Sequence, residues 1–294
     1  MTSATSTAEP LVPAEGTARM PDATTLRTLH WPPVGEPWAV ALIVHGLGEH
    51  AGRYETVAAA LTEAGIDVYG YDHRGFGGSS GFRAYVDHWS QLHDDLANRV
   101  EATRAERPGL PLVMYAHSLG GLIATGYVVP GTGRPLPDLL VLSAPGIEAV
   151  QPTWKKKLAA VLTGVVPRMR LANGLARDGL SHDPSVQAKV DADPLCISTS
   201  TVRFGAEAFA EQDRLRALLP GLASMPVPTY VLLGSDDPIV PPRSSEVLAA
   251  KGNVTRRVWP GLRHECHHEP EQADVLAAVV AWIRSQAAKL SAGG

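Results

Sequence analysis

A single serine between small residues is the feature of this chain that points most directly to chemistry. It lies in the segment Ala116–Gly121 (AHSLGG), after the apolar run 111–115 and before the helix-forming residues 122–125. This pattern predicts a strand, a tight turn and a helix with Ser118 at the apex, which is typical of a nucleophile elbow. Ala116 stands where glycine is more usual, and its methyl group is the smallest departure. An ordinary strand-to-helix loop is the alternative interpretation.

A serine hydroxyl becomes a nucleophile only when a base takes its proton and a third group orients that base. In the order that accompanies this elbow, the acid follows the serine and the histidine comes last. The segment Gly234–Pro238 (GSDDP) follows a predicted strand and offers two aspartates. We predict Asp237 rather than Asp236, because it holds the fourth place of the turn and a proline stiffens the backbone directly after it. A plain aspartate–proline turn is the alternative.

The base is expected in the segment Pro260–Glu265 (PGLRHE), which comes after the next predicted strand. His264 is predicted over His267 and His268, because it lies nearest to the end of that strand. Residues 264–268 also read H-E-x-x-H, a zinc-protease signature that needs both histidines on one face of a continuous helix. Flanking prolines leave barely two helical turns, so no metal ligand is predicted. A chelator-sensitive zinc peptidase is the alternative.

Two backbone amides are predicted to bind the oxyanion of a tetrahedral intermediate, a contact whose loss typically costs about 3 kcal/mol. One amide belongs to Leu119, the residue after the nucleophile. The other is assigned to Leu47 in the loop His45–Gly48 (HGLG), which comes after the apolar run 40–44. Glycines on both sides allow the unusual backbone that such a loop needs, although a simple glycine-rich turn has the same composition.

Short apolar runs alternate with longer helical stretches, which predicts an α/β protein with a mostly parallel sheet and helices on both faces. Strands are expected at 40–44, 66–71, 111–115, 139–143, 230–233 and 257–259, and helices at 54–64, 89–106, after Ser118 and at 274–286. Residues 146–218 interrupt the alternation and read as helices without strands. We predict that they form a cap over the carboxyl ends of the strands, inserted into a core of residues 25–145 and 219–294. An ordinary helical layer on the sheet is the alternative.

Composition limits the possible partners. The chain has 294 residues, is 45% hydrophobic and 19% charged, and carries a formal net charge of −4, as expected of a soluble globular protein. The longest basic block is Lys155–Lys157, which argues against nucleic acid as a partner, and no apolar stretch is long enough for a membrane-spanning helix. Residues 1–24 lack the features of a signal peptide and are predicted to be a disordered tail. The distant Cys196 and Cys266 favour a reduced cytoplasmic setting.

Several segments together resemble the monoacylglycerol lipase family of the α/β-hydrolase fold, and its bacterial members in particular. The resemblance extends from about residue 25 to the end of the chain. It is carried by His45–Tyr54, Asp72–Gly77, Ala116–Gly121, Leu142–Gly146, Gly234–Val240 and Trp259–Glu265, with Asp183-Pro184 and Asp193-Pro194-Leu195 in the cap. The first and last main motifs are specific, whereas many esterases share the middle ones.

The resemblance implies a serine hydrolase that releases fatty acid from monoacylglycerols through an acyl-enzyme, without a metal or cofactor. It makes Ser118 the nucleophile, Asp237 the orienting acid and His264 the base. A general carboxylesterase or lysophospholipase on the same scaffold is the closest alternative. A catalytically silent protein of this fold, which binds small ligands or partners, is the alternative outside enzymes, but it would not need three triad groups in order.

Family members also place the glutamate and arginine of the first motif, and the histidine three residues after the base, around the glycerol end of the substrate. In this chain those positions are Glu49, Arg53 and His267. A glycerol diol suits a carboxylate acceptor and charged donors in a small pocket. The alternative for Glu49 and Arg53 is that they only pin their own loop.

Apolar residues of the predicted cap suit an acyl pocket and contact with lipid, namely Trp154, Leu158, Val161 and Leu162. Lys155–Lys157 would add attraction to anionic headgroups, of about 1 kcal/mol for each lysine. We therefore expect a cytoplasmic protein whose cap contacts membrane or lipid-droplet surfaces peripherally. A solvated lid helix that packs its apolar face on the core is the alternative.

Overall fold

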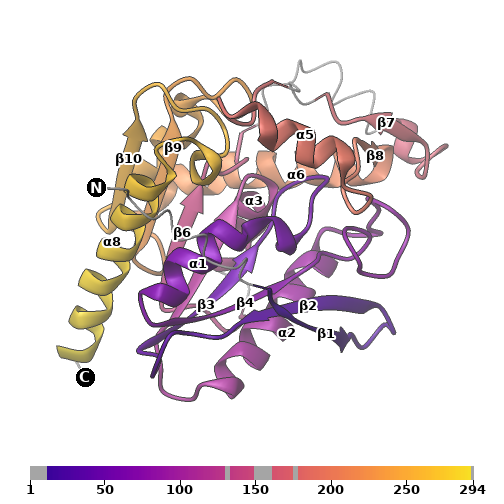
Figure 1. Ribbon diagram of the computed structural model, residues 1–294. Helices are drawn as coiled ribbons and strands as arrows, with labels where there is room; N and C mark the ends of the chain where they lie inside the picture. Colours follow the sequence, from indigo (N-terminus) through magenta and orange to yellow (C-terminus); the bar gives the residue numbers. More distant parts are fainter. Residues whose placement is uncertain (1–11, 130–132, 149–160, 175–177, 293–294) are drawn as a thin grey trace, which may run out of the picture.

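Eight strands form the central sheet in the order β1-β2-β4-β3-β5-β6-β9-β10 (Figure 1). The computed structural model describes residues 12–129, 133–148, 161–174 and 178–292. The strands are β1 (Ala14–Arg19), β2 (Thr25–Trp31), β3 (Ala39–Val44), β4 (Ile66–Tyr71), β5 (Leu112–His117), β6 (Leu139–Ser143), β9 (Thr229–Gly234) and β10 (Val254–Trp259). The six strands from β4 to β10 in this order are parallel, and every residue of β3, β5, β6 and β9 is buried. Burial on both faces explains why these strands are continuously apolar in sequence.

Helices cover both faces of this sheet. They are α1 (Glu55–Glu63), α2 (Ser90–Glu106), α3 (Leu119–Val128), α6 (Val202–Leu218), α7 (Glu246–Ala249) and α8 (Gln272–Ala292). One hydrophobic cluster joins the sheet to α2, α3 and α6, and a second joins it to α1 and α8. The predicted fold class is therefore confirmed. Within the described ranges, every helix is too short or too polar to cross a bilayer.

The region predicted as a cap contains strands as well as a helix. Strands β7 (Arg170–Ala172) and β8 (Thr199–Thr201) form a small antiparallel sheet, and α5 (Pro184–Ala192) lies between them in the chain. The expectation of helices without strands was wrong, because a strand of three residues is too short to show an alternating pattern. Figure 1 shows α5, β7 and β8 above the end of the sheet where the parallel strands finish.

Helix α6 belongs to the predicted cap by sequence but packs with the core. Its Phe204 and Leu215 are buried in the same cluster as residues of α2 and α3. The limits 146–218 for an inserted cap thus remain a prediction, with α6 acting as a layer on the sheet. The term "cap" hereafter denotes the described residues 161–174 and 178–201.

The amino-terminal prediction needs a correction. Residues 14–19, expected within a disordered tail, form β1 and pair with β2 from Ala14 opposite His30 to Arg19 opposite Thr25. Ala18 and Met20 are buried in the core. Only one residue of β1 is buried, so the strand depends on its partner and has no apolar pattern of its own. Residues 1–11 lie outside the described residues.

Candidate active site

The predicted nucleophile elbow is present in the backbone. Strand β5 ends at His117, α3 begins at Leu119, and Ser118 between them has φ 52° and ψ −114°. A side chain in this region is strained, and such strain concentrates at functional turns. A Cβ on Gly120 would lie 2.1 Å from the carbonyl oxygen of Val44, so this position excludes every other residue. The turn lifts Ser118 to the wall of a cavity of about 640 Å³.

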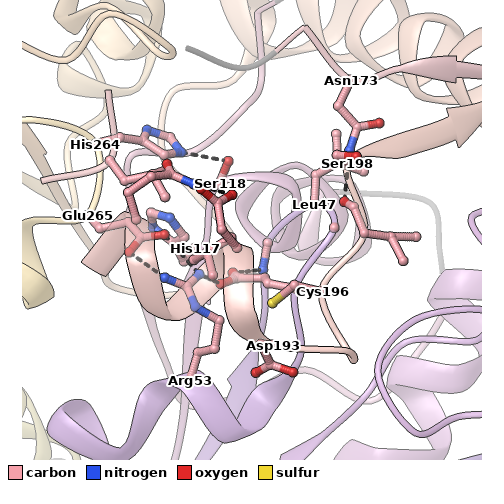
Figure 2. A pocket seen from close by; sticks show the side chains of 18 of the residues that line it. Leu47, Arg53, His117, Ser118, Asn173, Asp193, Cys196, Ser198, His264 and Glu265 are labelled. Atoms are coloured by element: carbon pink, nitrogen blue, oxygen red, sulfur yellow. Dashed lines mark hydrogen bonds and ion pairs between the residues drawn. The ribbon is translucent and has the colours of Figure 1, made fainter. Parts of the chain in front are cut away.

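Three predicted side chains meet at this serine. The Oγ of Ser118 lies 2.9 Å from Nε2 of His264 (Figure 2). Nδ1 of His264 lies 2.8 Å from Oδ2 of Asp237. Asp237 and His264 are buried, which keeps water from competing for these hydrogen bonds. The other carboxylate oxygen of Asp237 accepts the N–H groups of Ile239 and Val240, each at 2.8 Å. The acid is therefore held by its own loop while it faces the imidazole.

Close backbone packing brings the acid and histidine loops together. They follow the neighbouring parallel strands β9 and β10, and a Cβ on Gly234 would lie 1.9 Å from the carbonyl oxygen of Leu262. The backbone N–H of Asp236 donates to that same carbonyl, and its side chain accepts from the hydroxyl of Ser235. Asp236 thus forms hydrogen bonds that stabilise the turn, whereas Asp237 faces His264, as the sequence predicted.

The two amides assigned to the oxyanion lie next to the serine. Leu47 lines the cavity, and Leu119 supplies the first N–H of α3. Neither amide has a protein acceptor in the part of the chain that the structure describes. A Cβ on Gly46 would lie 3.3 Å from Cβ of Ser118, which places this loop directly against the nucleophile. The arrangement leaves two donors open where a negative oxygen would develop.

Glu49 and Arg53 line the cavity but are occupied by protein partners. Glu49 accepts the N–H of Gly46 at 2.6 Å and the hydroxyl of Tyr54 at 2.7 Å, and it forms an ion pair with Arg53. Arg53 also makes two hydrogen bonds to Glu265, at 2.9 and 2.8 Å (Figure 2). These contacts tie the oxyanion loop to the histidine loop, which fits the loop-pinning alternative.

Glu265 is a site residue that sequence reasoning missed. Burial favours its protonated form, but Arg53 and His268 hold the pKa of the Glu265 carboxyl well below its usual range. The carboxylate therefore stays charged beside the triad. Its partner Arg53 is 212 residues away in the chain, so no local pattern could have revealed the pair.

The structure does not place His267 where the family resemblance predicted. Its side chain is buried behind the cavity wall, stacked on Tyr54 with ring centroids 5.2 Å apart. Burial holds the pKa of His267 well below its usual range, and the neighbouring imidazoles of His268 and His117 oppose its protonation further. The ring is thus neutral and does not line the cavity, because the chain turns into a 3₁₀ helix at Cys266–His268. The contact with glycerol stays a prediction.

The 3₁₀ helix at Cys266–His268 is also incompatible with the continuous α-helix that the zinc signature requires. His264 precedes it and bonds to Ser118 and Asp237. His268 bonds to Glu265 through Nδ1 and to the carbonyl of Arg53 through Nε2. The two histidines therefore do not share the face of an α-helix that the signature requires. The nearby guanidinium of Arg53 would also repel a cation.

One further trio of possible metal ligands lies at the cavity edge, made of His50, Asp193 and Cys196. His50 Nε2 lies 2.8 Å from Asp193, and its Nδ1 accepts the N–H of Gly52 at 3.2 Å. A metal-binding histidine normally donates from its second nitrogen, whereas this one faces a donor. The contacts fit a hydrogen bond that ties the cap to the core.

Two of the four residues predicted for the apolar wall can be located in the structure. Trp154 and Leu158 lie outside the described residues. Val161 is 68% exposed and Leu162 is half-buried, and neither lines the cavity. The cap side of the cavity is formed instead by Asn173, Leu180, Gln187, Val190, Cys196, Ile197 and Ser198 among others.

Comparisons with known proteins show the family of this chain. The family described as Serine aminopeptidase, S33 matches residues 35–271. A monoacylglycerol lipase of Mycolicibacterium smegmatis is 34% identical over 87% of this chain and 91% of its own length. The monoglyceride lipase of Homo sapiens is 32% identical, over 88% of this chain and 86% of its own length.

Solved structures show the same fold. A soluble variant of monoglyceride lipase from Saccharomyces cerevisiae, in complex with a substrate analog, has a TM-score of 0.84 at 22% identity and covers 95% of this chain and 97% of its own. A monoacylglycerol lipase from Paleococcus ferrophilus has a TM-score of 0.75 at 27% identity, with coverage of 90% and 99%. The chain therefore belongs to the serine aminopeptidase S33 family of hydrolases, as a carboxylic ester hydrolase of the monoacylglycerol lipase type.

Proposed function

We propose that this chain hydrolyses monoacylglycerols through an acyl-enzyme, with Ser118 as nucleophile, His264 as general base and Asp237 as the orienting acid. The observation that carries the proposal is the continuous hydrogen-bonded path from Ser118 Oγ to His264 and on to Asp237, at 2.9 and 2.8 Å, on the wall of a cavity. Spacing of this kind lets the imidazole take the proton of the serine as the hydroxyl attacks the acyl carbonyl.

The remaining steps use groups that surround the serine. The amides of Leu47 and Leu119 stabilise the negative oxygen of the tetrahedral intermediate. His264 then protonates the departing glycerol oxygen, and it later activates the water that releases the fatty acid. The negative charge of Asp237 stabilises the imidazolium that forms in each step.

A neighbouring histidine supports this role for His264. The ring of His117 lies 4.7 Å from that of His264, between centroids. Burial, together with the charge of His264, lowers the pKa of His117 to about 4. His117 is therefore neutral near pH 7, and it does not oppose the positive charge that His264 gains during the reaction.

The choice of a monoacylglycerol rests on the cavity and on the names of the relatives. Apolar cap residues such as Leu180, Val190 and Ile197 suit an acyl chain, whereas the wall near Glu49 and Arg53 is polar. On the outside, the cap exposes Val161, Val165, Met169 and Leu171. We propose that this surface contacts lipid aggregates from the cytoplasmic side, as the sequence predicted.

A series of monoacylglycerols of different chain length, assayed with the wild type and Ser118→Ala, tests the proposal. We expect hydrolysis by the wild type and a loss of turnover of about 10⁶-fold in the variant, with an unchanged melting temperature. Near-normal hydrolysis by Ser118→Ala would refute the assignment of the nucleophile.

Two further substrates separate the alternatives. A Bacillus subtilis relative named phospholipase YtpA is 28% identical, which favours a lysophospholipid as the second candidate substrate. Faster hydrolysis of lysophosphatidylcholine than of any monoacylglycerol would replace the proposed substrate. If the wild type also fails on p-nitrophenyl butyrate, the protein is a silent member of the fold.

A further inference from the structure

The backbone around His264 is hydrogen-bonded to the cap. The N–H of His264 donates to the carbonyl of Gly179 at 3.3 Å, and the N–H of Glu265 donates to that of Leu180 at 2.8 Å. The guanidinium of Arg263 reaches the carbonyls of Asp178 and Ser181 at 2.7 and 3.0 Å. Hydrogen bonds therefore hold the loop of the predicted base against residues 178–182.

A buried carboxylate, Glu269, adds further hydrogen bonds between the loop of His264 and the cap. Its Oε1 accepts the backbone N–H of Arg263 at 2.6 Å, and its Oε2 accepts the backbone N–H of His182 at 2.8 Å. The hydroxyl of Ser181 lies 3.1 Å from Oε2, and Nδ1 of His182 lies 3.1 Å from Oε1. One carboxylate thus joins the residue before His264 to two residues of the cap.

Burial of the Glu269 carboxylate costs free energy, which its hydrogen bonds must offset. The side chain is 0% exposed, and within the described residues its partners include no lysine or arginine side chain. A buried carboxylate is unfavourable unless donors satisfy both oxygens, and removal of these donors would leave an uncompensated charge. The donors here come from two segments about 80 residues apart in the chain. The carboxylate therefore fixes the relative position of these segments through directional hydrogen bonds.

We infer that Glu269 is a positioning residue for the reaction. It holds the loop of His264 in the position where Nε2 bonds to the hydroxyl of Ser118. The inference rests on the proposed triad. Arg263, which Glu269 binds, directly precedes His264, so a tilt of this peptide moves the imidazole. A displacement of 1 Å in a catalytic group costs up to about 10²-fold in rate.

Glu269→Gln tests the inference, because glutamine keeps the size but turns an NH₂ group toward donors. We expect kcat to fall roughly 10- to 100-fold, with KM within about twofold of the wild type. The loss should be equal for a monoacylglycerol and for p-nitrophenyl acetate, whose short acyl group makes little use of the cap. Glu269→Asp keeps the charge with a shorter reach and should recover part of the activity.

Glu211→Gln is the matched control. Glu211 is also buried and bonds to Arg214 at 2.7 Å, but it lies on α6 away from the cavity. Its replacement should lower the melting temperature and leave kcat unchanged. His182→Ala is a second test variant that threatens folding less, since this side chain is 44% exposed. We expect its kcat to fall about threefold, because one donor to Glu269 is lost.

Three results would overturn the inference. The first is a kcat of folded Glu269→Gln within twofold of the wild type. The second is a loss confined to the monoacylglycerol, which would assign Glu269 to lipid binding by the cap. The third is a loss matched by Glu211→Gln. If the wild type hydrolyses p-nitrophenyl acetate but no monoacylglycerol, the proposed substrate fails, while the short ester still tests Glu269.

Discussion

The sheet core and the cap hold the same cavity by different means. In the core, the loops of the triad follow wholly buried strands, and at Gly120 and Gly234 the backbones leave no room for a side chain. The cap is attached through hydrogen bonds, such as that from the N–H of Ile197 to the carbonyl of Gly48 at 2.7 Å. Close packing resists displacement more strongly than hydrogen bonds that exchange with water. We therefore expect the core to hold the catalytic geometry and the cap to act on substrate entry, with Glu269 bonded to both regions.

Filling a tight backbone contact in the core should have the largest effect. Gly120→Ala would place a methyl group 2.1 Å from the carbonyl oxygen of Val44. We expect the free energy of unfolding to fall by about 3 kcal/mol, together with most of the activity. A Cβ on Gly205 in α6 would meet no atom within 4 Å, so Gly205→Ala is the matched control and should be neutral or stabilising by up to about 1 kcal/mol. Equal stability of the two variants in urea titrations would contradict the role given to core packing.

Acid should weaken the core next most strongly. Burial lowers the pKa of His45 to about 3 and the pKa values of His93 and His117 to about 4, and all three lie in the core. In the unfolded chain a histidine titrates near about 6.5, so between these values the unfolded chain binds more protons than the folded one. The free energy of unfolding should therefore fall as the pH drops from about 6.5 towards 4.

Urea titrations at pH 7, 6 and 5 measure this dependence. His93→Leu removes one site of proton uptake on unfolding. Its free energy of unfolding should therefore change less steeply with pH, and the slope should correspond to about one proton fewer. A wild type that is as stable at pH 5 as at pH 7 would rule out neutral buried histidines as the cause.

The smallest effect is expected on the outer surface of the cap. Leu171 is 50% exposed, and Leu171→Ser should weaken binding to phosphatidylcholine vesicles by about 1 kcal/mol, without changing turnover of p-nitrophenyl acetate. Val34 is 69% exposed but lies outside the cap, so Val34→Ser serves as the control and should bind vesicles like the wild type. A similar loss in both variants would mean that the cap is not a specific lipid-contacting surface.

Local patterns explain why much of the core was predictable. Strand β6 (Leu139–Ser143) has the predicted bounds, because a parallel strand buried on both faces leaves a nearly continuous apolar run. Strand β4 (Ile66–Tyr71) also has the predicted bounds. The elbow at Ser118 was equally visible, since its turn needs small neighbours. The acid and histidine loops each follow a strand, so their place at one edge of the sheet could be inferred from order alone.

Contacts with other segments explain what could not be predicted. Strand β1 depends on β2, and β7 depends on β8 across about 30 residues, so neither shows a pattern of its own. The roles of Glu265 and Glu269 depend on partners about 80 or more residues away in the chain. His267 illustrates the converse: its sequence position suggested contact with glycerol, but the turn of the chain buries it.

Covalent labelling most directly tests whether three distant side chains converge to activate one serine. We expect a fluorophosphonate probe to modify the wild type at Ser118, located by mass spectrometry of the peptides. Ser118→Ala should take up no label, and His264→Ala should react much more slowly while it remains folded. Labelling of Ser118→Ala at the wild-type rate, or a modified residue other than Ser118, would show that no such convergence activates this serine.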